Sequence, residues 1–198
     1  MIAAFAIDVG AYVKRIVKNG GNYGWMRLEG HWVAGRWRGG ALNELYPLPE
    51  EILDGRQKDG FIYPVAMYDH DEGRAISGGF AYHGKITALR GKYVFGDINS
   101  GRIFAADLAE MKKADDGIPR TVAPIEEVQL YVRDAGGNRV AVSFQELINR
   151  KMGDKIARAD LFISQTRDGE LLITSRQDGT IRMLVPDSTA SGTTPSTR

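Results

Sequence analysis

The densest group of chemically versatile side chains lies in one short stretch, Asp69-His70-Asp71-Glu72-Gly73-Arg74. Its carboxylates could bind Ca²⁺ through oxygen atoms, and Asp69 and His70 could form a pair for proton transfer. The stretch lacks the alternating D-x-D-x-D-G spacing of a calcium loop, and charged turns are common on protein surfaces. A solvated or salt-bridged turn is therefore the alternative to a catalytic or metal site.

Arginines at the edges of predicted strands form a second group, consisting of Arg102, Arg158 and Arg176. A guanidinium fixed at the edge of a sheet could bind a carboxylate through two hydrogen bonds. A single exposed arginine more often forms a surface ion pair worth under about 1 kcal/mol. The arginines would indicate a binding site only if they converge on one axis.

The elements that must position these side chains are short β-strands punctuated by glycine. From Gly78 onward, aromatic and β-branched residues between turn signals predict strands at 79–83, 92–98, 102–107, 128–132, 161–163, 170–175 and 180–185. Asp-Gly pairs at 168–169 and 178–179 predict hairpin turns, because glycine accepts a positive φ. Residues 143–151 predict one short helix with Ser143 as its N-cap.

The strands before and after this helix repeat one pattern at a shift of 78 residues, from Tyr93 to Leu171. Tyr93-Val94-Phe95 aligns with Leu171-Leu172-Ile173, and Ser100-Gly101 aligns with Asp178-Gly179. Repeats of about four strands are typical of β-propeller blades, and a two-hairpin β-sandwich is the alternative. Propellers close with roughly four to eight blades and this all-β chain holds about two, so either the fold is not a propeller or the chain is part of one. Its open edges predict either a missing portion or self-association.

Composition excludes several classes of function. With 26 basic and 25 acidic residues among 198, the net charge of +1 offers no electrostatic footprint for nucleic acid. The absence of cysteine excludes disulfides and a cysteine nucleophile, and three histidines disfavour a multi-histidine zinc site. No apolar stretch is long enough to span a bilayer, and the first ten residues lack the basic n-region of a secretory signal. Residues 187–198 are expected to form a disordered tail.

Five motifs follow one another along the chain: NGGNYGW at 19–25, YPVAMYDHDEG at 63–73, AISGGFAYHG at 75–84, LRGKYVFGDINSGRIF at 89–104 and DGELLITSRQDGTIRML at 168–184. Together they resemble the C-terminal part of the glucose/sorbosone dehydrogenase family. That family comprises six-bladed β-propellers, including the soluble pyrroloquinoline quinone (PQQ)-dependent sugar dehydrogenases. The resemblance implies that residues 1–186 form the last two to three blades of a propeller, with one short helix in an insertion.

The resemblance implies an oxidoreductase that oxidises the anomeric carbon of an aldose with hydride transfer to PQQ. In the family, Ca²⁺ polarises the quinone and a histidine accepts the proton of the sugar hydroxyl. The matching histidine lies in an early blade that this chain does not contain, so we expect the isolated chain to be inactive. Family members are usually exported, which implies a periplasmic or secreted location.

Site residues follow from the resemblance position by position. Gly10 and Ala11 match the main-chain oxygen ligands of Ca²⁺, and Arg158 matches an arginine that holds PQQ. Asn99 stands where a lysine contacts PQQ in the soluble glucose dehydrogenases, and asparagine cannot supply that cation. The Asp69-His70 motif is expected to face the substrate end of the propeller. A non-catalytic propeller module that binds a carbohydrate or a protein, and a structural remnant without activity, are the alternatives to an enzyme.

Overall fold

The first sheet is small and precedes a one-turn helix. Its strands have the order β1-β2-β3 and comprise Leu28–Glu29, Trp32–Ala34 and Leu45–Pro47. Helix α2 (Glu50–Leu53) follows directly. Leu28 and Val33 of the sheet pack with Leu53 and Tyr63 in one buried cluster. This cluster ties the first sheet to the segment that leads into the second sheet.

The second sheet is a four-stranded antiparallel meander in which consecutive strands are neighbours. Its strands are β4 (Ile76–Ala81), β5 (Lys92–Asp97), β6 (Ile103–Asp107) and β7 (Ile125–Glu127). A short 3-10 helix, η2 (Thr87–Leu89), lies in the β4–β5 connection. Helix α3 (Leu108–Ala114) begins where β6 ends, and Asp107 caps it by accepting the N–H groups of Ala109 and Glu110.

The third sheet has three antiparallel strands, β10 (Leu161–Gln165), β11 (Leu171–Ser175) and β12 (Thr180–Met183). Gly169 and Gly179 adopt φ values of +85° and +61° in its two turns. Both Asp-Gly hairpins predicted from the sequence are therefore confirmed. The repeat is visible as well, since Gly101 in the β5–β6 turn has a φ of +76° at the position that corresponds to Gly179.

A separate hairpin and a helix connect the second and third sheets. The hairpin consists of β8 (Leu130–Arg133) and β9 (Arg139–Val142), and α4 (Phe144–Met152) follows it. The Ser143 hydroxyl accepts the N–H of Glu146, and the Glu146 carboxylate accepts the N–H of Ser143. This capping box confirms the predicted helix and its N-cap.

Two sequence predictions about these elements are wrong. The fourth strand of the second sheet is β7 at residues 125–127 and not the predicted strand at 128–132, because Leu130 already belongs to the β8–β9 hairpin. The prediction of one short helix is also wrong, since α2 and α3 are present in addition to α4. Helix α3 buries Met111 and Ala114, whose spacing of three residues places them on one helical face.

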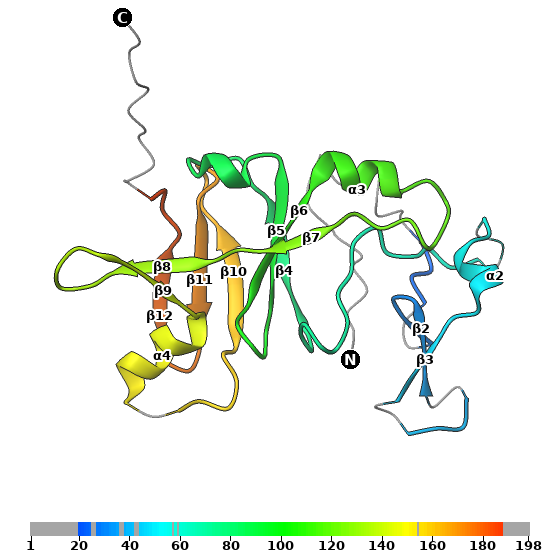
Figure 1. Cartoon of the computed structure of the whole chain (residues 1–198), viewed down its shortest axis with the longest axis horizontal. Helices are drawn as coiled ribbons and strands as arrows, with labels where there is room; N and C mark the ends of the chain where they lie inside the picture. Colours follow the sequence, from blue (N-terminus) through cyan, green and yellow to red (C-terminus); the bar gives the residue numbers. More distant parts are fainter. Residues whose placement is uncertain are drawn as a thin grey trace, which may run out of the picture.

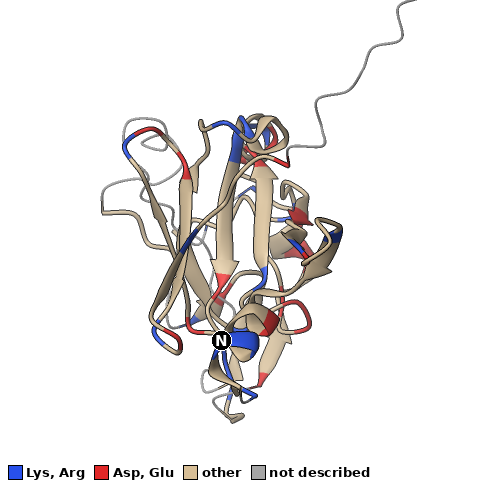
Figure 2. Ribbon diagram, turned by 90° about the vertical axis from the view of Figure 1, so that its left-hand side faces the viewer, with Lys and Arg blue, Asp and Glu red and all other residues tan. Residues whose placement is uncertain are grey.

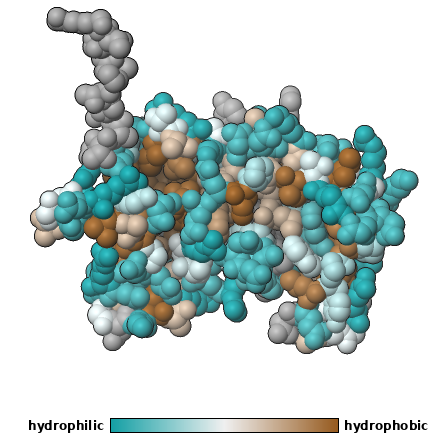
Figure 3. Space-filling model, viewed as in Figure 1, coloured by the Kyte–Doolittle hydropathy of each residue, from teal (hydrophilic) through white to brown (hydrophobic). Residues whose placement is uncertain are grey.

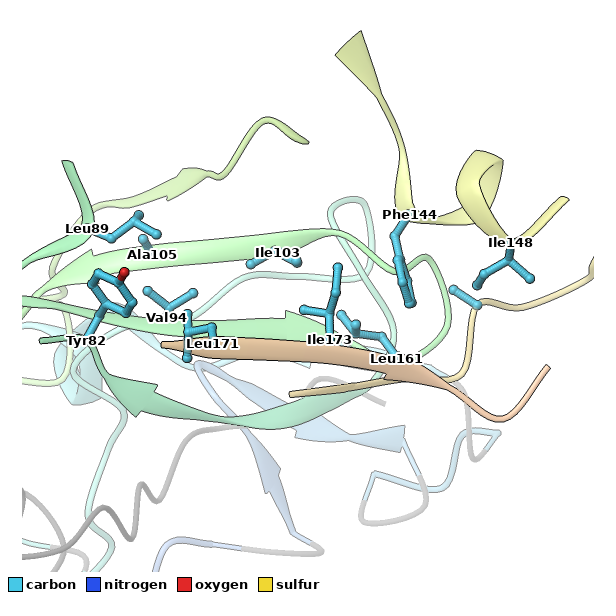
Figure 4. Close-up of a cluster of buried hydrophobic side chains, with 11 residues drawn as sticks. Tyr82, Leu89, Val94, Ile103, Ala105, Phe144, Ile148, Leu161, Leu171 and Ile173 are labelled. Carbon is cyan, nitrogen blue, oxygen red and sulfur yellow. The ribbon is translucent and has the colours of Figure 1, made fainter. Parts of the chain in front are cut away.

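The second sheet is buried on both faces. On one face, aromatic residues of β5 and β6 pack with Tyr68 and with Met111 of α3; these aromatic residues are Tyr93, Phe95 and Phe104. The other face carries Val94, Ile103 and Ala105, which pack against residues of the third sheet and of α4: Leu161, Leu171, Ile173, Phe144 and Ile148 (Figure 4). Because successive residues of a strand point to opposite faces, β5 contributes to both clusters.

The structure, a computed structural model, describes residues 20–24, 27–35, 38–41, 44–56, 58, 60–153 and 155–187. Over these residues the chain is all-β, and the three sheets follow one another along its long axis (Figure 1). On the face shown in Figure 3, an apolar area lies at the upper left, in the part of the molecule formed by β8–β12. None of the helices in the described ranges has the length and hydropathy needed to cross a bilayer. The predicted tail lies, from residue 188 onward, outside the described residues.

Candidate functional site

The predicted site residues of the described chain gather at one end of the second and third sheets. The segment before β4 meets the β5–β6 turn, because the Ile98 N–H donates to the Ala75 carbonyl at 2.6 Å. The segment before β10 meets the same turn, since the Ala159 N–H donates to the Asn99 carbonyl at 2.7 Å. We call this end of the two sheets the Asn99 end. Arg158 directly precedes Ala159, so the structure brings Asn99 and Arg158 together.

A buried carboxylate holds two arginines at the Asn99 end. The Arg176 Nε–H donates to Asp160 Oδ2 at 2.8 Å, and the Gln177 amide donates to the same oxygen at 2.6 Å. Arg158 Nε lies 2.6 Å from Asp160 Oδ1, in an ion pair without the alignment of a hydrogen bond. Asp160 exposes 2% of its side chain, whereas Arg158 and Arg176 expose 49% and 75%. Two exposed cations are thus anchored by one buried anion, and a net positive charge remains at the surface.

The electrostatic balance at Asp160 favours the ionised carboxylate. Burial by itself would raise the pKa of Asp160. The hydrogen bonds from Arg176 and Gln177 and the charge of Arg158 outweigh burial, so the pKa lies below its ordinary value. Asp160 also has a φ of +47°, a left-handed conformation that aspartate tolerates better than most residues. Asp160 combines this backbone conformation with a buried carboxylate that contacts both guanidinium groups.

The Asp69-His70 stretch is a hydrogen-bonded turn. The Asp71 N–H donates to Asp69 Oδ1 at 2.8 Å, and the Asp69 N–H donates to Glu72 Oε2 at 2.9 Å. His70 Nε2 lies 3.9 Å from Glu29 Oε2, and the Glu29 side chain is 8% exposed. The turn thus places the His70 imidazole next to a nearly buried carboxylate of the first sheet.

Asp97 joins the turn to the sheet. Its Oδ2 accepts the N–H groups of Arg74 at 2.6 Å and Ala75 at 2.7 Å and the Tyr68 hydroxyl at 3.1 Å. Its Oδ1 accepts the N–H of Ser100 at 2.6 Å and the Ser100 hydroxyl at 2.8 Å. Burial alone would raise the pKa of Asp97, but these hydrogen bonds outweigh burial and lower it. The fully buried carboxylate is therefore a structural hub that fixes the start of β4 and the β5–β6 turn.

The third predicted arginine has different partners. Arg102 Nη2 donates to Glu127 Oε2 at 2.7 Å, Nη1 donates to the Glu72 carbonyl, and the guanidinium lies 4.9 Å from the centroid of the Phe104 ring. Arg158 and Arg176 thus converge on Asp160, while Arg102 connects the Asp69-His70 turn to β7.

The predicted calcium ligands Gly10 and Ala11 lie outside the described residues. Among residues 20–187, apart from the positions left undescribed, no group of three or more His, Cys, Asp or Glu side chains could hold a metal ion.

A small groove opens beside the Asn99 end, between the β5–β6 turn and the base of the β8–β9 hairpin. Its volume is about 160 Å³, and its wall includes Ser100, Arg102, Glu127 and Phe144. Clefts that enclose drug-sized ligands usually measure about 300–1,000 Å³. A ligand of cofactor size would therefore need walls in addition to those of this groove.

Two important residues of this region were missed in the sequence. Asp97 could have been found from its position three residues before Ser100 in a Gly-Asp-x-x-Ser-Gly turn, because aspartate accepts main-chain N–H groups in such turns. Asp160 gave a weaker signal, since an Arg-x-Asp sequence does not reveal which carboxylate is buried.

No protein-family model and no solved structure matches the chain.

Proposed function

We propose that this chain is part of a β-propeller of the glucose/sorbosone dehydrogenase type and contributes cofactor-holding groups to the oxidation of an aldose at its anomeric carbon. Sheet order supports the propeller: each sheet is an antiparallel meander, and the second and third sheets stack face to face. The first strands of these two sheets, β4 and β10, are also close neighbours, as expected for strands nearest to a propeller axis.

The observation that carries the functional proposal is the pair of exposed guanidinium groups on the buried Asp160. PQQ bears carboxylates, and arginine binds carboxylates through paired, charge-assisted hydrogen bonds. Asp160 contacts the Nε atoms of Arg158 and Arg176, and both side chains remain largely exposed. The two arginines therefore fit a carboxylate-bearing cofactor, and the amide of Asn99 would add a neutral hydrogen bond.

The residues at the Asn99 end would have different roles in binding the cofactor and in the reaction. The chemistry that PQQ supplies when bound is the acceptance of a hydride. Arg158 and Arg176 orient an anionic ligand, and Asp160 keeps both cations in place. His70, beside Glu29, lies on the turn expected to face the sugar and is the described candidate for accepting a proton. The main-chain oxygens of Gly10 and Ala11, which the resemblance assigns to Ca²⁺, lie outside the described residues. A periplasmic or secreted location belongs to the same proposal.

Equilibrium dialysis of the full chain with PQQ tests the proposal. We expect Arg158→Ala to weaken PQQ binding by about 10- to 100-fold, the scale of a charge-assisted hydrogen bond. The matched control is Arg150→Ala, which removes an exposed arginine from α4 and should leave PQQ binding unchanged. The absence of PQQ binding, or equal affinity in both variants, would contradict the proposal.

A second candidate function is a non-catalytic propeller module that binds a carbohydrate or protein. The neutral Asn99 at the expected cation position favours it, because asparagine cannot neutralise a carboxylate. PQQ binding separates the two functions, because a non-catalytic module has no need of the cofactor. A dye-reduction assay with glucose, PQQ and Ca²⁺ tests in addition whether this chain by itself is catalytic. We expect no turnover from the isolated chain; turnover that disappears in His70→Gln would assign the base to His70.

A further inference from the structure

The β8–β9 hairpin carries two arginines directly opposite each other. Arg133 of β8 pairs with Arg139 of β9, and their side chains are 44% and 47% exposed. Like charges at directly opposed positions of two strands destabilise the pairing of those strands. A two-stranded hairpin is also only marginally stable in water without further contacts. The pairing of β8 with β9 near the turn is therefore favoured by an anion placed between the two arginines.

The carboxylate of Asp187, which follows β12, lies between the two guanidinium groups. Arg133 Nη2 donates to Asp187 Oδ1 at 3.1 Å, and Arg139 Nε lies 3.1 Å from Asp187 Oδ2. The Asp187 side chain is 28% exposed, so most of it is withdrawn from water. One carboxylate shared by two cations forms a small network, which stabilises a structure more than an isolated surface ion pair does.

Residues 184–187, which we call the strap, present this carboxylate to the hairpin. The Leu184 N–H donates to the Leu171 carbonyl at 2.9 Å, and Leu184 packs against the core between the second and third sheets. Pro186 has a fixed φ and favours an extended conformation of the residue before it. The strap therefore runs from the core to the hairpin, and Asp187 has little freedom to swing away from the arginines.

The hairpin itself orients both guanidinium groups. The Arg139 guanidinium lies 3.4 Å from the centroid of the Tyr131 ring, a cation–π contact on the same face of the hairpin. Arg133 Nη1 donates to the Gly137 carbonyl in the turn at 2.8 Å. Basic and acidic segments are interspersed on this side of the molecule (Figure 2). The two oriented arginines form a seat for one carboxylate, and Asp187 occupies it.

The base of the same hairpin forms one wall of the groove beside the Asn99 end. Leu130 and Val142 pair across the hairpin and line this groove. Towards the turn, residues 133–141 are all exposed, and the turn projects beyond the third sheet (Figure 1). Exposed backbone hydrogen bonds of this kind open at low cost in free energy. A change in the position of the hairpin would therefore alter the wall of the groove.

We propose that the strap is a clasp that holds the β8–β9 hairpin in place and thereby fixes one wall of the groove. Loss of the contacts of Asp187 with the arginines releases the hairpin as a flap hinged at Leu130 and Val142, while the three sheets stay intact. Salt weakens the clasp, because dissolved ions screen exposed charges. The clasp depends on Asp187, Arg133 and Arg139, and it is independent of PQQ binding.

Amide hydrogen exchange of the ¹⁵N-labelled full chain, followed by NMR, tests the clasp. The Asp134 N–H donates to the Asn138 carbonyl, and hydrogen-bonded pairs alternate along an antiparallel ladder. The amides of Val132 and Val140 therefore belong to the ladder, and they should exchange about 10-fold faster in Asp187→Asn. The amide of Ile173 in β11 should exchange at an unchanged rate, which shows that the variant is folded.

Asp168→Asn is the matched control, because it removes an exposed aspartate from the β10–β11 turn and should leave the exchange of Val132 and Val140 unchanged. Sodium chloride at about 1 M should accelerate both amides in the unmodified chain and have little further effect in Asp187→Asn. Unchanged exchange in Asp187→Asn would overturn the proposal, and so would equal acceleration in Asp168→Asn. Equal acceleration at Ile173 would indicate a general loss of stability and also overturn it.

Discussion

Gly96 of the second sheet packs directly against Leu161 of the third sheet. A Cβ atom at position 96 would overlap Leu161 Cδ2 and would lie 3.2 Å from Ile163 Cδ1. The absence of a side chain at Gly96 therefore allows the two sheets to pack at their observed separation.

Replacing Gly96 by alanine should lower the free energy of unfolding by about 1–3 kcal/mol, because the added methyl group overpacks the contact between the sheets. Urea unfolding measures the effect. Gly78→Ala is the control in the same sheet, since a Cβ atom there would meet nothing within 4 Å. Equal stability of the two variants would show that the sheets do not meet at Gly96.

Asp97→Asn should lower the free energy of unfolding by about 3 kcal/mol, because an amide cannot accept all the hydrogen bonds that converge on the carboxylate. Chemical unfolding at neutral pH gives the comparison. In the control, Asp107→Asn, the substituted residue caps α3, where asparagine is as good a cap as aspartate. A loss at Asp97→Asn no larger than in the control would refute the role of Asp97 as a hub.

The stability of the chain should fall in acid. The pKa of Asp97 is lower in the folded chain than the value of about 3.9 for an unfolded aspartate. The folded state consequently binds fewer protons, and the stabilisation is complete above that unfolded value and is lost as the pH falls through the folded pKa. Unfolding free energies should be level between about pH 5 and 7 and decline below about pH 4. The decline in unfolding free energy should be shallower in Asp97→Asn. Parallel pH profiles of the variant and the unmodified chain would contradict the contribution of the Asp97 carboxylate to acid sensitivity.

Two substitutions at position 160 separate the contribution of the charge to stability from that of the backbone conformation. Asp160→Asn removes the charge but keeps a residue that tolerates positive φ, and it should cost about 2 kcal/mol of unfolding free energy. Asp160→Ala also adds the penalty of a left-handed alanine, about 1 kcal/mol more. Thermal unfolding of both variants checks the difference. If the alanine variant is as stable as the asparagine variant, the φ of +47° carries no strain.

The local pattern of the sequence was enough to predict the two Asp-Gly hairpins, the repeat and the capped helix, but not the β8–β9 hairpin. Asp-Gly turns, alternating strands and the Ser143 cap each depend on residues close in sequence. The last strand of the second sheet could not be predicted in this way, because Glu126 and Glu127 have a low strand propensity. Only the tertiary pairing with β6 makes Ile125–Glu127 a strand.

The candidate site was predicted in part. Asn99 and Arg158 were each identified separately, and their proximity results from a main-chain hydrogen bond between segments about sixty residues apart. Asp160 was not predicted, because its role depends on burial beneath Arg158 and Arg176. No local sequence pattern indicates that burial. The Asp69-His70 motif was found, but its neighbour Glu29 comes from the first sheet.

The most direct test of the account is an NMR titration of the ¹⁵N-labelled chain with PQQ. The main-chain amide resonances of Asn99, Ala159 and Gln177, at the Asn99 end, should shift saturably. Those of His83 and Gly169, which lie in contact at the opposite end of the sheets, should stay in place. An unchanged spectrum, or shifts centred on His83 and Gly169, would contradict the proposed cofactor site.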